Sequence, residues 1–443
     1  MSTPQRTPPS PAGKATSSLI DQAPDFLRSG YLFASRVRAR AGVDPASDTP
    51  VPFPLLGKRT VLLRGAEGVR YFYDRSKVKR DGAMPVFIRG PLFGAGAVHG
   101  LDGEAHATRK KAMAAVAYDD AHVDRFATLV VEELGRMLDG WRRTGRGSVY
   151  DDTATAYGRA AFRWAGIELP EREADARARQ MSRLLDTFGR PATTLVSWAE
   201  RRRLDTWSTG LVEEVRAGRR TAVEGTALAA MAELRDENGG LVDAHTAAVE
   251  LQNLTRPTVA VARFAAFAAV ALTEHPEWAG RVREAAGETG ALDSAAINPV
   301  SIAFAQEVRR YYPFVPMLPA LATTDGEVGG CPVHRGDRLL IDILGTNTDP
   351  QAWERPATFD PERFLGVDDA EQIECFIPQG GADVVSGHRC PGEKIAVTAL
   401  AATVSALARR EVVISGDVDD TTFSWTHMLT RPRTGVRVSV RSA

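Results

Sequence analysis

Apolar residues recur every three to four positions along most of the chain, which places them on one side of an α-helix. This spacing predicts helices over residues 105–115, 121–143, 153–166, 172–188 and 195–217. A longer pattern, rich in Ala, Val and Phe, predicts a helix over 244–272, and another over 301–312 ends before Pro313. A helical pattern returns over 391–410. The chain is therefore expected to be mainly α-helical.

Two kinds of segment predict a small β portion. FPLLGKRTVLLRG, residues 53–65, is typical of two short strands around a Gly-containing turn, and VRVSV near the C-terminus alternates like a strand. Gly, Pro and β-branched residues are also frequent over 313–385. No linker divides the body, so we expect a single domain over residues 19–443. Residues 1–18, rich in Pro, Ser and Thr, predict a disordered tail.

Composition excludes several classes of protein. The 443 residues are 44 % hydrophobic and 25 % charged, which is ordinary for a globular chain, and the formal net charge is −1. Such a balance gives no reason to expect nucleic acid or an anionic membrane surface as a partner. Without a long apolar run or a secretory signal, we expect no membrane span and a cytoplasmic protein. Three cysteines do not make a disulfide framework.

One cysteine stands in an unusual loop, FIPQGGADVVSGHRCPGEKIAV. Its glycines allow the backbone to fold tightly and to approach a flat ligand, and Pro391 suits the first turn of a helix. The positive end of that helix and the neighbouring Arg389 should lower the pKa of Cys390, as an iron ligand requires. A buried, inert cysteine in a turn is the alternative, and this loop alone favours that alternative.

Two further motifs change the balance. Glu307 and Arg310 are three positions apart on one predicted helix face, and Arg363 in FDPERF could complete a buried cluster with them. The order of this helix pair, the PERF loop and HRCPGE resembles the cytochrome P-450 family. The resemblance implies the cytochrome P-450 fold, and haem b with its iron bound by the thiolate of Cys390.

The long helix carries Arg256 and Pro257 in the middle of an apolar run, LQNLTRPTVAVARFAAFAAV. Pro257 removes a backbone hydrogen bond and should bend the helix. A guanidinium buried there is costly unless it meets an anion. Alternatively, the helix starts at Pro257 and Arg256 lies at the surface. The cysteine motif favours an Arg256 that projects over the iron.

The Arg-Pro pair replaces the acid and alcohol that usually relay protons in this family, and it is a mark of the fatty-acid peroxygenase branch. PQGG followed by six residues and HRCPGE, together with LFGAGAVHGLDGEAHATRKK, EVRRYYPF and GTNTDPQAWERP, extends the resemblance from about Asp25 to near the C-terminus. It implies that Arg256 binds the carboxylate of a fatty acid. That carboxylate then takes and returns a proton of hydrogen peroxide, the co-substrate. The expected products are 2- or 3-hydroxy acids, terminal alkenes, or both, with no obligatory electron-transfer partner.

The resemblance also assigns residues around the substrate. His99 lies in a loop above the haem, where a His accompanies alkene-forming members of the branch and a Gln accompanies hydroxylases. Phe93 matches a pocket aromatic near the carboxyl end of the substrate, and Phe314, Met317 and Leu318 match the lining of the substrate channel. A solvated His99 and plain core packing of the other four are the alternatives.

Basic residues are expected at the haem propionates. His106, Arg109 and Lys110 in HATRKK match the propionate-facing helix of the family, and Arg80 matches another propionate contact. A solvated basic face is the alternative, above all for Lys110.

Two other functions stay open at this point. One is a cytochrome P-450 monooxygenase of another carboxylic acid that receives electrons from a redox partner, although the missing acid–alcohol pair argues against it. The other is a non-catalytic haem sensor, but the haem motifs are accompanied by nothing that resembles a partner-binding or DNA-binding module. Substrate identity is open as well, because an aromatic acid would satisfy Arg256 equally.

Overall fold

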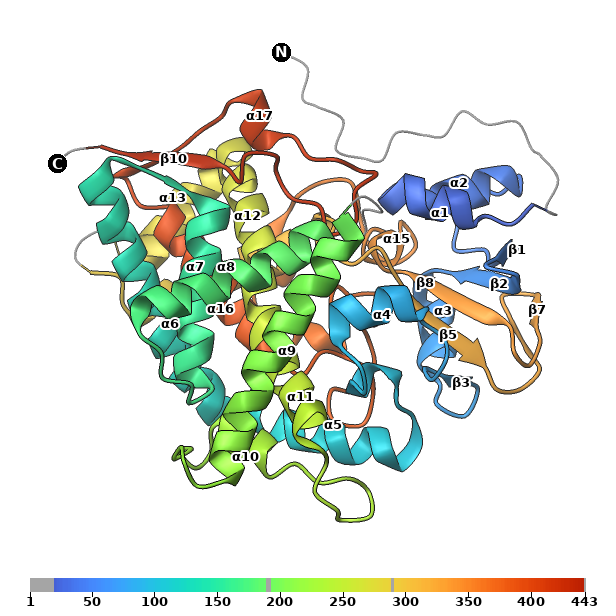
Figure 1. Ribbon diagram of the computed structural model, residues 1–443. Coiled ribbons are helices and arrows are strands. Elements are labelled where there is room, and N and C mark those ends of the chain that lie inside the picture. Colours follow the sequence, from blue (N-terminus) through green and yellow to red (C-terminus); the bar gives the residue numbers. More distant parts are fainter. Residues whose placement is uncertain (1–19, 189–192, 288–290, 442–443) are drawn as a thin grey trace.

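Helices make up most of the chain and gather on one side of a smaller sheet region (Figure 1). The computed structural model describes residues 20–188, 193–287 and 291–441, so the tail predicted over 1–18 lies outside it. The helices are α1 Ala23–Ser29, α2 Phe33–Arg40, α3 Gly65–Tyr73, α4 Val86–Phe93, α5 Gly103–Ala117, α6 Asp120–Thr144, α7 Val149–Trp164, α8 Glu171–Thr187, α9 Thr194–Arg216, α10 Ala227–Ala232, α11 Ala244–Ala260, α12 Ala262–Glu274, α13 Pro276–Ala286, α14 Pro299–Tyr311, α15 Ile343–Asn347, α16 Glu393–Leu407 and α17 Val418–Thr421.

The helices predicted from apolar spacing are all present, and their ends differ from the prediction by a few residues. The largest difference is in α7, which begins at Val149 rather than at residue 153. After the cysteine, α16 begins at Glu393 with Gly392 as its N-cap. Pro391 therefore lies in the turn before the helix and not in its first turn, as the sequence had suggested. The mainly helical fold class is confirmed.

A five-stranded sheet has the strand order β1-β2-β8-β5-β3, in which β2 and β8 are parallel and the other neighbours are antiparallel. The predicted strand pair over 53–65 is confirmed as β1 and β2, and VRVSV is confirmed as β10. The strands are β1 Val51–Leu55, β2 Lys58–Leu63, β3 Val78–Lys79, β4 Arg146–Ser148, β5 Met317–Ala322, β6 Gly326–Val328, β7 Cys331–Val333, β8 Arg338–Asp342, β9 Val412–Ile414 and β10 Arg437–Val440.

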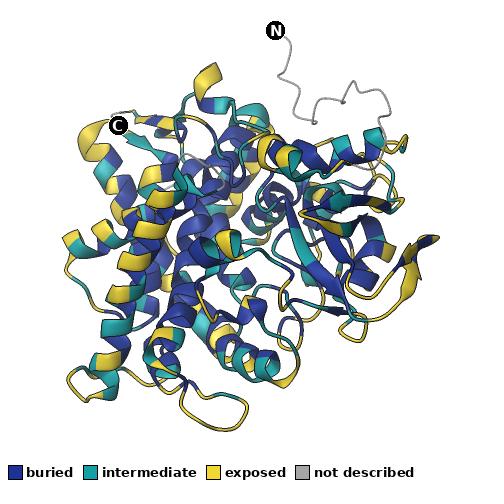
Figure 2. Ribbon diagram, turned by 45° about the vertical axis from the view of Figure 1, so that its right-hand side comes forward, coloured by how far each residue is buried: buried dark blue, intermediate teal, exposed yellow. Residues whose placement is uncertain are grey.

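The core of the helical part surrounds α11 and α12, which are buried along almost their whole length (Figure 2). Helices α7, α9 and α16 pack around this pair. The bend expected from Pro257 is present, because α11 ends at Ala260 and α12 starts at Ala262, one helical turn after the proline. The helix that continues through Arg256 excludes the alternative in which it starts at Pro257.

One helix in the described part of the chain, Ala244–Glu274, is long and apolar enough to cross a membrane by length and composition. However, 83 % of its most apolar window is buried inside the protein, as in the core helix of a globular domain. This helix is therefore weak evidence for a membrane span.

Candidate active site

A cavity of about 190 Å³ lies where α11 passes the cysteine loop, and it brings together most of the predicted site residues. Nine of them line it: Phe93, His99, His106, Lys110, Arg256, Pro257, Phe314, Leu318 and Cys390. The predicted channel residue Met317 lines an adjoining cavity of about 310 Å³, which shares Leu92, Phe93, Val315, Leu318 and Leu429 with the first. Arg80 and Arg109 are not among the described lining residues of either cavity.

The cysteine loop holds the Cys390 thiol at the cavity wall. The backbone N–H of Cys390 donates to the carbonyl oxygen of Gln379 at 3.0 Å, which closes the loop on itself. Gly380 has φ +94°, and a Cβ there would lie 3.0 Å from the carbonyl oxygen of His388, so a larger residue would strain the loop.

The expected fall in the thiol pKa is not found. Burial raises the pKa of Cys390, and Lys110 opposes that shift. The side chain of Arg389 turns away to Glu393, so it is not the cation that acts on the thiol. Iron ligation, rather than the protein environment alone, would have to supply the thiolate.

A buried cluster fixes the loop to the protein behind it. Arg389 donates from Nε to Glu393 Oε2 at 2.6 Å, and Arg309 of α14 donates to Glu393 Oε1. Burial raises the pKa of Glu393, but the two guanidiniums outweigh it and hold this pKa below its usual value. The residue next to Cys390 is thus anchored to two helices.

The Glu–Arg–Arg cluster predicted from the sequence is also present. Glu307 accepts two hydrogen bonds from Arg310, at 2.6 and 2.7 Å, and both side chains are completely buried. Arg363 lies 3.7 Å from Glu307 Oε1 and is the looser member. Arg310 also donates to backbone carbonyls of the segment before Arg363, including Thr358 at 3.0 Å, so the cluster joins α14 to that loop.

Lys110 and His106 of α5 reach the cavity beside the cysteine loop. Lys110 Nζ donates to the carbonyl oxygen of Arg389 and is buried, so the surface alternative for Lys110 is wrong. The rings of His106 and His388 lie 4.0 Å apart between centroids. Burial is the largest cause that lowers the pKa of both histidines, that of His106 to about 4, so both are neutral at physiological pH.

The other two predicted propionate contacts are engaged elsewhere. Arg109 donates to the carbonyl oxygen of Gly96 at 2.5 Å and lies 3.3 Å from Glu250 Oε1. Arg80 donates to the carbonyl oxygen of Phe72 at 3.0 Å and stacks on its ring. Neither arginine lines the cavity.

Arg256 is 4 % exposed, and its guanidinium enters the cavity that contains the Cys390 thiol. Nη2 donates to Asn253 Oδ1 at 3.0 Å, whereas Nε is buried without a hydrogen-bond partner. Burial, and then the nearby Arg201, lower the pKa of Arg256 to about 9, which leaves it a cation at neutral pH. Among the described residues, Arg256 makes no ion pair with a carboxylate.

His99 lies in a short 3-10 helix, Val98–Gly100, and stacks on Phe93 with 4.0 Å between ring centroids. His99 is exposed by its accessible surface, and it is among the residues that line the cavity. Burial lowers the pKa of His99 to about 3, and the imidazole is therefore neutral.

Sequence reasoning missed Asn253, His388 and Arg201. Asn253 stands three positions before Arg256, the helical spacing that lets side chains meet, and that spacing could have identified it. His388 is two residues before the cysteine and was visible in HRCPGE. Arg201 comes from α9, and no local signal places it near Arg256.

The residues present fit a haem group. A thiol, the nitrogen-bearing side chains of His106, Lys110 and His388, and many apolar lining residues are what a thiolate-ligated haem with anionic propionates requires. The tight approach of the backbone at Gly380, on the same wall, leaves room for a flat ligand.

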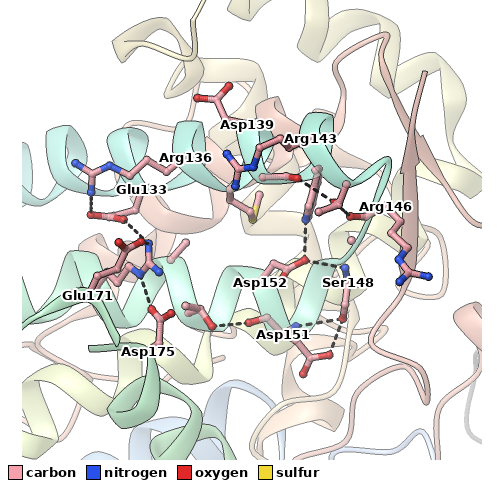
Figure 3. A pocket seen from close by; sticks show the side chains of 18 of the residues that line it. Glu133, Arg136, Asp139, Arg143, Arg146, Ser148, Asp151, Asp152, Glu171 and Asp175 are labelled. Atoms are coloured by element: carbon pink, nitrogen blue, oxygen red, sulfur yellow. Dashed lines mark hydrogen bonds and ion pairs between the residues drawn. The ribbon is translucent and has the colours of Figure 1, made fainter. Parts of the chain in front are cut away.

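A larger depression of about 860 Å³ lies elsewhere, between α6, α7 and α8 (Figure 3). Its acidic and basic residues largely pair with one another: Arg136 with Glu133 at 2.5 Å and Arg159 with Asp175 at 2.5 Å. Its described lining includes no cysteine or histidine. This depression is therefore not the candidate active site.

Comparisons with known proteins agree with this geometry. The cytochrome P-450 family model matches residues 227–439. The sterol 14alpha-demethylase of Mycolicibacterium vanbaalenii is 24 % identical over 383 residues, 81 % of this chain and 82 % of the relative. A solved variant of cytochrome P450SP alpha (CYP152B1) is 35 % identical, with a TM-score of 0.84, over 95 % of this chain and 98 % of that chain. Ligand-free cytochrome P-450 OleT is 29 % identical, with a TM-score of 0.86, over 96 % of this chain and 97 % of that chain.

The similarity to P450SP alpha covers nearly all of both chains. The chain itself carries the cysteine loop, the Glu307–Arg310 pair and the Arg256–Pro257 helix that the sequence had singled out. The chain therefore belongs to the cytochrome P-450 family, within its fatty-acid peroxygenase branch, and is a haem-thiolate oxidoreductase.

Proposed function

We propose that this enzyme oxidises fatty acids with hydrogen peroxide, by hydroxylation at the α or β carbon, by oxidative decarboxylation to terminal alkenes, or by both. Two similar proteins support a fatty-acid substrate, because P450EX alpha was solved with myristic acid and an OleT variant with arachidonic acid. P450EX alpha is 32 % identical to this chain, with a TM-score of 0.81.

The observation that carries the proposal is the unpaired, buried charge of Arg256. A cation removed from water without a counter-ion is costly, so it is expected to bind an anion in the working enzyme. A carboxylate fits the planar guanidinium through two charge-assisted hydrogen bonds. The apolar residues around the cavity, including Phe314 and Leu318, suit the hydrocarbon chain of that acid.

Haem would be held by Cys390 and would supply peroxide activation and C–H oxidation there. Arg256 holds the substrate carboxylate in the same cavity, where that carboxylate accepts a proton from peroxide and returns it. In hydroxylation, one peroxide oxygen enters the product and the other leaves as water. In decarboxylation, both peroxide oxygens leave as water and the carboxyl carbon leaves as carbon dioxide. Asn253 positions Arg256 through its hydrogen bond to Nη2.

His99 contributes a neutral imidazole, since burial lowers its pKa to about 3. It can donate or accept a hydrogen bond at the cavity without bringing a second positive charge next to Arg256. Stacking on Phe93 fixes the plane of the ring. His106, Lys110 and His388 would pair with the haem propionates.

The test is turnover of a panel of short- to long-chain fatty acids by the haem-loaded protein with hydrogen peroxide alone, with the products identified. Arg256→Ala should lose nearly all acid turnover and keep the carbon monoxide spectrum of a thiolate-ligated haem. Normal acid turnover by this variant would overturn the carboxylate hypothesis.

A second experiment tests whether the enzyme needs a redox partner. With peroxide and no reductase, the protein should reach its full rate, and adding a ferredoxin, its reductase and NADPH in place of peroxide should give little product. The opposite pattern would support a partner-dependent monooxygenase instead.

A further inference from the structure

The larger of the two joined cavities is apolar except at one point. Of its described lining residues, only Arg338 carries a charge, and nearly all the others are aliphatic, aromatic, proline or methionine. This cavity shares five lining residues with the cavity of Arg256 and Cys390, so the two cavities adjoin and are together called the channel. A single guanidinium on such a wall requires an explanation, since an apolar chain gains nothing from it.

Arg338 is buried and only partly satisfied. It is 6 % exposed, and Nη1 donates to the carbonyl oxygen of Leu55 at 2.7 Å. Its Nε is buried without a hydrogen-bond partner, and among the described residues no carboxylate forms an ion pair with it. Asp21 raises the pKa of Arg338 only through a longer-range charge interaction. The carboxylate of Asp21 already accepts hydrogen bonds from the backbone N–H groups of Leu56 and Gly57.

The sheet directs Arg338 towards the channel. Side chains two positions apart on a strand leave the same face, so Arg338 and Leu340 of β8 point the same way. Leu340 lines the channel, as does Pro319, its partner on β5. The guanidinium therefore belongs to the channel wall and not to the opposite face of the sheet.

Arg338 lies in the outer part of the channel. Three apolar side chains that line this cavity, Leu27, Leu56 and Phe87, are 40 to 49 % exposed, so the cavity opens to the surface beside them. The carbonyl group that Arg338 contacts belongs to Leu55, next to the exposed Leu56. Arg256 lines the inner cavity and Arg338 the outer one, and the residues that the two cavities share are all apolar.

We propose that the enzyme accepts straight-chain α,ω-dicarboxylic acids, with one carboxylate on Arg256 and the other on Arg338. This rests on the proposed function, because Arg256 must first hold the carboxylate that reacts. The apolar wall between the two arginines accommodates the methylene chain. Only diacids whose length matches the separation of the two guanidiniums can engage both, so the preference should be confined to a narrow range of chain lengths.

The test measures equilibrium binding to the haem-loaded protein by the absorption shift of the haem, for monocarboxylic and α,ω-dicarboxylic acids of equal length. For the matching lengths, the diacid should bind at least about tenfold more tightly than the monoacid, as two further charge-assisted hydrogen bonds allow. Arg338→Gln should remove this preference and leave monoacid binding within about twofold of its original value.

Arg59→Gln is the matched control. Arg59 lies on the neighbouring strand β2, pairs with Asp337 and does not line the channel, so this variant should keep the diacid preference. If Arg338→Gln does not incorporate haem, the binding measurements on the unmodified protein decide the proposal, because that protein must show the length-dependent preference for diacids.

Each negative result has a separate meaning. If monoacids bind and turn over but no diacid length is preferred, the role of Arg338 is wrong and the proposed function stands. A diacid preference that survives in Arg338→Gln also overturns that role. An equal loss of monoacid and diacid affinity in Arg338→Gln contradicts it too, because Arg338 would then act on any incoming acid. If neither class binds, Arg256 does not hold a carboxylate, and both proposals fail.

Discussion

At the scale of single residues, Arg256 differs from most of the other buried arginines because no carboxylate of the described residues pairs with it. The chain pairs five of them with its own carboxylates at short range, namely Arg201 with Asp205, Arg263 with Asp186, Arg310 with Glu307, and both Arg309 and Arg389 with Glu393. Arg256 has only the neutral amide of Asn253. A chain that neutralises so many buried guanidiniums leaves this one for an external anion.

His99 gives a residue-scale prediction. In the branch to which the chain belongs, we expect a His at this position to favour the alkene product, so His99→Gln should lower the ratio of terminal alkene to hydroxy acid several-fold. Product analysis by gas chromatography after peroxide-driven turnover measures that ratio. The exposed His334 provides the control, since His334→Gln should leave the ratio unchanged.

The same side chain predicts a pH dependence. The pKa of His99 is lowered to about 3, so the imidazole stays neutral above that pH and gains its proton only below it. The product ratio should therefore stay constant between about pH 5 and 8. An inflection near pH 6.5 that disappears in His99→Gln would contradict this assignment.

At the scale of elements, the cysteine loop depends on Glu393, the first residue of α16, which holds one arginine from α14 and one from the loop. Glu393→Gln leaves two buried guanidiniums facing a neutral amide. Breaking a buried pair in this way should lower the free energy of unfolding by about 3–5 kcal/mol and weaken haem retention. Urea unfolding and the haem-to-protein absorbance ratio measure these effects.

A surface pair provides the matched control for that change. Glu374 pairs with Arg70 at 2.8 Å, but both side chains are largely exposed, so Glu374→Gln should cost less than about 1 kcal/mol. Equal losses in the two variants would mean that the buried cluster does not stabilise the loop.

Elements were more predictable from the sequence than the contacts between them. Apolar spacing identified the long helices, and Pro257 identified the bend, because both signals are local. The partner of Arg109 was not predictable, since Glu250 lies far away in the sequence and only packing brings the two side chains together. The prediction that the pKa of Cys390 falls was wrong, because burial outweighs the nearby positive charges.

At the scale of the whole molecule, the sheet side and the helical side meet at the channel. Strands β5 and β8 form part of one wall, whereas α11 and the cysteine loop close its inner end. The channel should therefore select the acids that reach the iron. Its outer part should set the preferred length of the acid and not the products that form.

Met317 tests that division of roles. It lies on β5 in the outer cavity and does not line the inner one. Met317→Trp should raise KM for long-chain acids several-fold more than for short-chain acids, with little change in the products. Val418→Trp, at an exposed position of α17, is the control and should alter neither. A uniform loss of kcat over all chain lengths would place Met317 outside the channel's function.

The central claim is that Arg256 draws an organic anion into the cavity of the Cys390 thiolate. A crystal structure of the haem-loaded protein with a bound fatty acid tests it most directly. The predicted result is a carboxylate with both oxygens within hydrogen-bond distance of the Arg256 guanidinium, about 2.7–3.2 Å, on the side of the haem opposite Cys390. A carboxylate bound elsewhere, or a guanidinium turned away from the haem, would contradict the account.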